Sequence, residues 1–176
     1  MKRLPLLAAI VVGALALGPS VATGCGDKFV LIGGGARVNR SKFPSRVLVF
    51  MNPGSRIPAA EKEFHVEATL AAAGHKPKVV ESEAEVEKAL ASGQYDLVLA
   101  DLADVPALKE KCGASASKPA VLPLLYKPTT EELAAAEKEA NCLARPSKRS
   151  SDLLAVIDET MQSRQKGASP NCPPPR

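Results

Sequence analysis

The sequence predicts an α/β fold: a doubly wound, five-stranded parallel sheet in the order 2-1-3-4-5, with helices on both faces. Apolar runs alternate with segments of helical composition between residues 46 and 164. The runs at 46–51 and 96–100 are almost continuously apolar, which is typical of strands covered on both faces. Residues 82–85 and 129–132 have the spacing of capping boxes, which open helices.

Each predicted strand is followed by a helix, so the strands are expected to be parallel. Strands are expected at residues 46–51, 78–81, 96–100, 120–126 and 142–144, the last of them weak. Helices are expected at residues 59–73, 82–93, 106–112, 129–140 and 151–164. Pro123 lies inside the fourth strand, where it removes a ladder donor and predicts a bulge.

The ends of the chain differ from this central domain. We expect a signal peptide at 1–24, a tether arm at 25–45, the α/β domain at 46–164 and a loose, proline-rich tail at 165–176. The signal peptide is indicated by Lys2 and Arg3, followed by an apolar run of about 14 residues, too short for a membrane span of about 20. Within the arm, a short strand-like run at 29–32 precedes three glycines. No helix signal follows them, which favours a hinge or tight turn over a phosphate loop.

The residues before Cys25 resemble the lipobox of bacterial lipoproteins. Val21-Ala22-Thr23-Gly24 are small or aliphatic and lead into a cysteine that would be lipidated and become the N-terminus. Residues 20–22 also offer ordinary signal peptidase a small-x-small site, so plain secretion is the alternative. Either route places the domain outside the cytoplasm: in the cell envelope as a membrane-anchored lipoprotein facing the periplasm or exterior, or otherwise secreted or periplasmic. Disulfides are allowed there.

Composition argues against several classes of function. The formal net charge is +4, and removal of Lys2 and Arg3 lowers it further, so nucleic acid is not an expected partner. Aromatic residues make up 3% of the chain and Trp is absent, which argues against a stacking platform for single strands. There are two histidines, His65 and His75, and no cluster with zinc spacing. No Ser or Cys nucleophile is placed to use either, so we expect no metal, no cofactor and no enzyme activity.

The middle of the domain resembles the receiver domain of response regulators. The segments that carry the resemblance are Leu70-Ala71-Ala72-Ala73-Gly74-His75, Val86-Glu87-Lys88-Ala89-Leu90, Asp96-Leu97-Val98-Leu99-Ala100-Asp101-Leu102 and Leu143-Ala144-Arg145-Pro146. They are similar to the family's L-x-x-x-G-H, E-A-L, D-L-V-L-x-D-L and L-x-K-P patterns. The resemblance extends over about residues 46–164 and implies a flavodoxin-like domain.

The receiver site that the resemblance implies is degenerate. Its positions, at the carboxyl ends of the strands, are Met51, Asn52, Asp101, Tyr126, Lys127 and Arg145. Asp101 matches the phosphoryl-accepting aspartate of the family. Met51 and Asn52 replace the acidic pair that holds Mg²⁺, and a thioether and a neutral amide suit a hard cation poorly. No hydroxyl residue ends the fourth strand, and Arg145 replaces the family's lysine.

Two structural roles are open for Asp101: it caps the turn that follows, or it pairs with Arg145. Because receivers commonly hold the matching Lys-Pro bond in cis, the resemblance also implies a cis bond between Arg145 and Pro146. The function expected is a non-catalytic, membrane-tethered interaction module whose partner is an unidentified envelope protein. The alternative is an exported protein that binds a small molecule in the crevice at the strand ends.

Four cysteines are present: Cys25, Cys112, Cys142 and Cys172. In a doubly wound fold, the connections that hold Cys112 and Cys142 are neighbours at the lower pole, which favours a Cys112–Cys142 disulfide. If Cys25 carries lipid, Cys172 is left free or pairs between chains. If it does not, a Cys25–Cys172 bond is the alternative.

Overall fold

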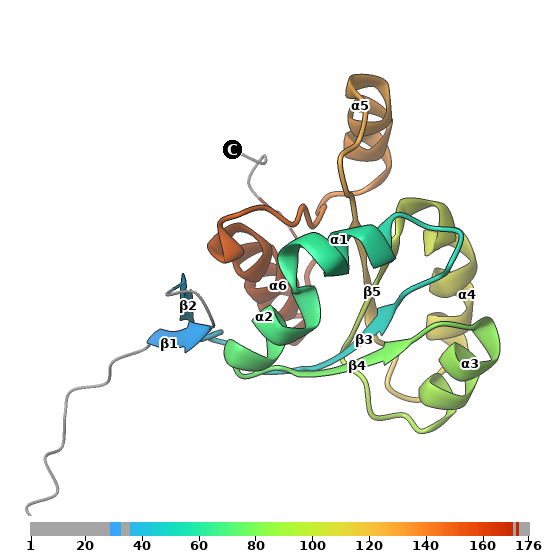
Figure 1. Cartoon of the computed structure of the whole chain (residues 1–176). Helices are drawn as coiled ribbons and strands as arrows, with labels where there is room; N and C mark the ends of the chain where they lie inside the picture. The colour runs from blue at the N-terminus through green and yellow to red at the C-terminus, as the bar shows by residue number, and fades with distance from the viewer. Residues whose placement is uncertain (1–28, 33–35, 171, 173–176) are drawn as a thin grey trace, which may run out of the picture.

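The computed structural model describes residues 29–32, 36–170 and 172 as an α/β domain with a short hairpin in front of it (Figure 1). The expected signal peptide and Cys25 lie outside the described residues. No helix in the described part of the chain is long and apolar enough to cross a membrane.

Four parallel strands form the central sheet. They are β3 (Arg46–Phe50), β4 (Lys76–Val80), β5 (Leu97–Asp101) and β6 (Ala120–Leu124), in the order β4-β3-β5-β6. The parallel sheet is therefore confirmed, and its order matches the first four strands of the predicted one. The prediction of five strands is wrong for this sheet.

The predicted fifth strand is reduced to a single bridge between Leu124 and Ala144. Ala144 donates its N–H to the Pro123 carbonyl (2.8 Å), and its own carbonyl accepts from the N–H of Leu125 (2.8 Å). Pro146 follows two residues later and has no N–H to continue a ladder. The expected bulge at Pro123 is also not formed, because β6 keeps a continuous register with β5 from Ala120 to Leu124.

The helices cover both faces of the sheet. They are α1 (Ile57–Phe64), α2 (Val66–Ala72), α3 (Glu83–Ala91), α4 (Val105–Ala114), α5 (Thr130–Glu139) and α6 (Ser150–Gln165), with a 3₁₀ turn, η1 (Leu102–Asp104), before α4. Both capping boxes are confirmed, at Ser82 with Glu85 and at Thr129 with Glu132. The single helix predicted at 59–73 is broken in two at His65, whose φ of 48° is left-handed.

The alternation of side chains along β3 divides the core into two layers. Val47 and Val49 face the layer formed with α1, α2 and α6, whereas Leu48 and Phe50 face the layer formed with α3 and α4. All four side chains are buried. Helix α5 differs from the rest: it stands out from the body (Figure 1) and buries only Ala136 of its own residues.

The described part of the arm before β3 contacts the domain. Strands β1 (Phe29–Ile32) and β2 (Ala36–Asn39) pair antiparallel, which confirms the strand at 29–32. Ser41 donates its N–H to the carbonyl of Ala73 (2.9 Å) and its hydroxyl to Asp158 of α6. The arm therefore joins the domain beside the C-terminal end of α2 and the middle of α6.

The disulfide joins Cys142 to Cys172, so the predicted Cys112–Cys142 bond is wrong. Cys112 is a buried free cysteine within α4, in the core layer of α3 and α4, whereas Cys142 lies in the layer of α1, α2 and α6. The sheet separates the two sulfurs. The tail that we expected to be loose is fastened to the domain at Cys172.

Candidate functional site

A hollow of about 540 Å³ lies at the carboxyl edge of the sheet, where the predicted site is located. The polar side chains that line it are Asn52, Ser55, Arg56, Asp101, Asp104, Tyr126, Glu132 and Glu139. Three of these, Asn52, Asp101 and Tyr126, belong to the predicted set. The hollow forms where the loops after β3, β5 and β6 meet, as parallel topology requires.

Asp101 ends β5 and caps the turn that follows it. Its carboxylate accepts the backbone N–H of Ala103 (3.2 Å) through one oxygen and that of Arg56 (3.2 Å) through the other. The capping role is therefore confirmed, and among the described contacts Asp101 makes none with Arg145. By holding Arg56 as well, Asp101 also fixes the loop that begins α1.

Replacing Asp101 with alanine should lower the free energy of unfolding by about 1–2 kcal/mol, because the variant leaves two backbone donors without their acceptor. Asp101→Asn keeps one carbonyl oxygen and should lose less. Denaturant unfolding of the two variants measures the difference. Equal stability of Asp101→Ala and the wild type would contradict the capping role.

Asn52 uses both ends of its amide within the loops of the site. Its Nδ2 donates to Asp104 Oδ1 (3.0 Å), and its Oδ1 accepts from the N–H of Gly54 (3.1 Å). The other oxygen of Asp104 is buried without a hydrogen-bond partner among the described residues. Asn52 thus ties the loop after β3 to the loop after β5, and each end of its amide already makes one hydrogen bond.

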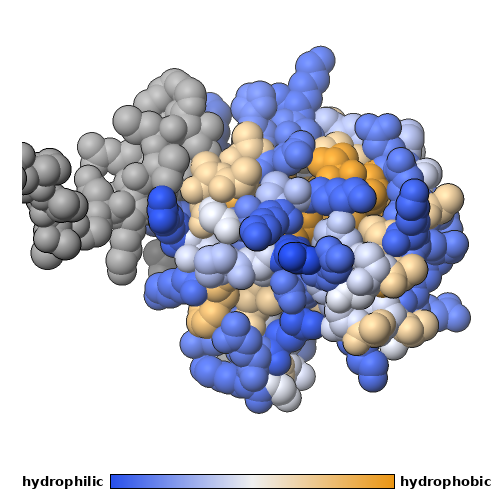
Figure 2. Space-filling view, turned by 90° about the horizontal axis from the view of Figure 1, so that it is seen from below, coloured by the Kyte–Doolittle hydropathy of each residue, from blue (hydrophilic) through white to orange (hydrophobic). Residues whose placement is uncertain are grey.

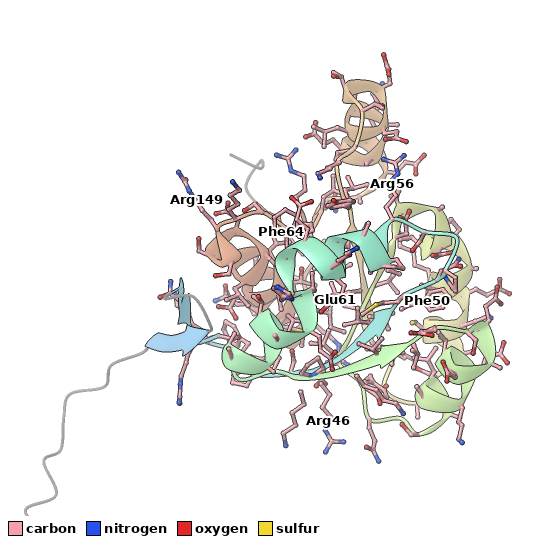
Figure 3. All side chains as sticks on the ribbon, viewed as in Figure 1. Arg46, Phe50, Arg56, Glu61, Phe64 and Arg149 are labelled. Atoms are coloured by element: carbon pink, nitrogen blue, oxygen red, sulfur yellow. A yellow bond between two sulfur atoms is a disulfide. The ribbon has the colours of Figure 1, made fainter. Side chains whose placement is uncertain are left out.

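Arg56, directly before α1, lines the hollow and is labelled in Figure 3. Its guanidinium forms a two-pronged ion pair with Glu132 of α5, with Nη1 2.9 Å from Oε2, and Nη1 also donates to the Lys127 carbonyl (3.3 Å). Hydrogen bonding and charge attraction lower the pKa of Glu132 and raise the pKa of Arg56. Because Glu132 also closes the capping box of α5, this one carboxylate joins α5 to the site.

Lys127 and Tyr126 share one carboxylate on α1. Lys127 Nζ lies 2.7 Å from Glu63 Oε2, which also accepts the Tyr126 hydroxyl. These hydrogen bonds lower the pKa of Glu63, and the bond from Lys127 raises the pKa of that lysine. The Tyr126 ring in turn meets Phe64 edge-on, at 6.1 Å between centroids. Both residues are therefore occupied by α1.

Three predicted residues do not line the hollow: Lys127, Met51 and Arg145. Met51 packs partly buried against the core layer of α1, α2 and α6. Arg145 is half-buried, and no described side chain pairs with it. The predicted cis bond before Pro146 is wrong, because every described peptide bond is trans. The position of Arg145 therefore does not follow the receiver pattern.

Sequence reasoning missed three residues that organise the site: Arg56, Glu63 and Glu132. The first two lie in α1 or directly before it, where the sequence offered only a helical pattern. Glu132 was recognised as the capping residue of α5, and that signal did not show its second partner.

The described residues contain no group of three or more His, Cys, Asp or Glu side chains arranged to hold a metal ion. Comparison of the chain with protein-family models, with curated proteins and with solved structures finds no match to any of them.

Proposed function

We propose that the chain is a non-catalytic, membrane-tethered protein-interaction module built on a degenerate receiver-like domain. The observation that carries the proposal is that the polar side chains at the carboxyl edge already bind other groups of the same domain. Asp101 is occupied by two backbone donors, and Asn52 by Asp104 and Gly54. Arg56 and Lys127 are held in ion pairs. A nucleophile or a metal-binding carboxylate here would first have to break contacts that organise the loops.

The partner-facing surface in this proposal is the carboxyl edge together with α5. Helix α5 stands clear of the body (Figure 1), and its exposed flank carries small side chains at Ala134 and Ala135. The Arg56–Glu132 ion pair holds the helix in place without covering that flank.

The tether is tested at Cys25. We expect Cys25→Ser to convert a detergent-extractable membrane protein into an unprocessed precursor or a soluble protein, because two or three acyl chains anchor a protein in effect permanently. Mass spectrometry of the mature N-terminus reads the modification directly. A mature chain that begins at Thr23, or an unmodified Cys25, would contradict the tether and leave the interaction role open.

The interaction role is tested by capture from detergent-solubilised membranes. The wild type should retain an envelope protein that Ala135→Arg loses, since an arginine on the exposed flank of α5 blocks a close contact. Ala91→Arg, at the exposed end of α3, is the matched control and should capture as the wild type does. Stable labelling of Asp101 by acetyl phosphate and Mg²⁺ would contradict the non-catalytic reading.

A second candidate, binding of a small molecule at the carboxyl edge, is favoured by the hollow itself and by the unpartnered oxygen of Asp104. A thermal-shift screen separates the two functions. A reproducible, ligand-specific rise in Tm that Arg56→Gln abolishes and Arg149→Gln preserves would favour the binding protein. Arg149 is an exposed residue outside the lining of the hollow.

A further inference from the structure

The amino-terminal ends of the strands form the pole opposite the candidate site. The segments that meet there are 41–45, 74–75, 92–96, 115–119 and 166–168. Backbone hydrogen bonds link them: Lys76 N–H donates to the Ser45 carbonyl (2.9 Å), and Ala120 N–H to the Asp96 carbonyl (3.0 Å). The end of α6 reaches the same pole, since Arg164 contacts Asp96 Oδ1 (3.3 Å) and the Ser117 carbonyl (2.7 Å).

This pole gathers positive charge. We call it the cationic pole and define it by Lys42, Arg46, Lys76, Lys118, Arg164 and Lys166. All of these side chains are exposed except Arg164, which is half-buried. Figure 2, which looks at the molecule from below, shows hydrophilic side chains spread over this face with apolar patches between them, and Figure 3 shows Arg46 at this lower end.

Acidic residues do not balance these charges. Two carboxylates lie among the six cations: Asp96, which is engaged by the Arg46 N–H (3.0 Å) and by the Arg164 guanidinium, and Asp158 of α6, which accepts the N–H groups of Lys42 (3.2 Å) and Phe43 (3.4 Å). Within the part of the chain that the structure describes, Arg46, Lys76, Lys118 and Lys166 form no ion pair. Arg56 and Lys127 at the opposite edge are both paired.

Two of the cations are placed at a cost to the sheet. Arg46 and Lys76 are register partners at the start of the parallel strands β3 and β4, and two like charges on neighbouring strands repel each other. Arg46 relieves part of this through a hydrogen bond to Gln94 Oε1 (2.7 Å), which adds no negative charge. An anionic partner outside the chain would remove the repulsion.

We propose that the cationic pole is a membrane-contacting surface that binds the anionic head groups of phospholipids. The inference rests on the proposed function, because the membrane is the binding partner only if the domain is tethered to it. A tethered domain stays close to the bilayer surface. The chain also enters the domain at this pole, through Ser41 and Ser45. Contact there orients the domain so that the carboxyl edge and α5 face away from the bilayer.

The test uses the whole chain carrying Cys25→Ser, so that no acyl chain contributes to binding. Its sedimentation with phosphatidylcholine vesicles is measured with and without phosphatidylglycerol, at low salt. One variant adds Lys76→Gln, Lys118→Gln and Lys166→Gln. The matched control removes three exposed charges away from the pole, with Lys138→Gln, Lys148→Gln and Arg149→Gln. The apolar residues 4–17 are the same in both, so their contribution cancels.

The pole variant should bind anionic vesicles about a hundredfold more weakly than the control, since each basic residue near an anionic surface contributes roughly fivefold. The difference should vanish in pure phosphatidylcholine and shrink at high salt. Equal binding by the two variants, or greater loss in the control, would overturn the proposal. So would a pole variant that loses affinity for duplex DNA but not for vesicles. The tether is tested separately: an unmodified Cys25 in the mature wild type would contradict it. That result would not affect the vesicle comparison, because both variants there carry Cys25→Ser.

Discussion

Removing the Cys142–Cys172 disulfide should lower the free energy of unfolding by roughly 3–4 kcal/mol, the cost expected for opening a loop of this length. The two cysteines are 30 residues apart and enclose the whole of α6. In the unfolded chain the bond restricts the conformations of this segment. In the folded domain it holds the tail against α6, where Cys172 Sγ lies 4.0 Å from the Val156 carbonyl oxygen. The double variant Cys142→Ala with Cys172→Ala should therefore lose roughly 10–15 °C in Tm.

Reduction provides the control for this variant. A reductant should destabilise the wild type by about as much as the double variant and leave the double variant unchanged. Cys112 should not interfere, since burial raises the pKa of its thiol to about 11 and keeps it protonated and unreactive in the folded domain. A wild type whose Tm is insensitive to reductant, or a peptide map that joins Cys112 to Cys142, would contradict the structure.

The predicted disulfide was wrong because local sequence patterns do not show which face of the sheet a helix covers. The sequence placed Cys112 at the end of a short helix, in a loop near Cys142. Helix α4 instead continues to Ala114, and the apolar environment of Cys112 belongs to the layer formed with α3. Which face of a sheet a helix covers depends on the crossovers of the whole chain. Hydrophobic periodicity within one helix carries no such information.

Elements with a local signal were predicted well. The capping boxes at Ser82 and Thr129 begin α3 and α5 as expected, because side-chain oxygens three residues apart satisfy the first N–H groups of each helix. The break at His65 had no such signal, since neither Gly nor Pro marks it. Histidine is among the residue types enriched in the left-handed region, but that tendency is too weak to predict a break at one position.

The candidate site was predicted in position but not in its contacts. Parallel topology brings Asn52, Asp101 and Tyr126 to one edge, so their proximity followed from the strand order. Their partners are Arg56, directly before α1, and Glu63, within α1, and no motif marked either residue. These partners bind Asp101 and Tyr126, which lie at positions that the receiver site would use, so the observed contacts of these residues are structural.

Acid should weaken the domain through His75, which lies 4% exposed between the arm and the core. Its Nδ1 accepts the Ser45 N–H (3.2 Å) and lies 2.9 Å from the Ser45 hydroxyl. Since a backbone N–H can only donate, Nδ1 must be unprotonated, and the ring is neutral with its proton on Nε2. Nε2 has no partner among the described residues. Protonating Nδ1 would therefore break the bond that fixes the start of β3.

Burial lowers the pKa of His75, and Asp158 opposes this only in part. The unfolded chain takes up the proton near pH 6.5, whereas the folded domain resists it to a lower pH. The free energy of unfolding should therefore be unaffected by His75 above about pH 6.5 and fall as the pH drops towards the folded pKa. A single group limits the slope to about 1.4 kcal/mol per pH unit.

Two asparagine variants isolate this effect. His75→Asn offers an acceptor to Ser45 but cannot be protonated, so its stability should change less between pH 6.5 and 5 than that of the wild type. His65→Asn is the control: His65 is exposed and left-handed, a conformation that asparagine tolerates, and its removal should leave the slope unchanged. Denaturant unfolding across this range lies largely above the ordinary pKa of carboxylates, which otherwise dominate acid unfolding. A wild-type slope that persists in His75→Asn would assign the acid sensitivity to other groups and remove His75 as the link between pH and the arm.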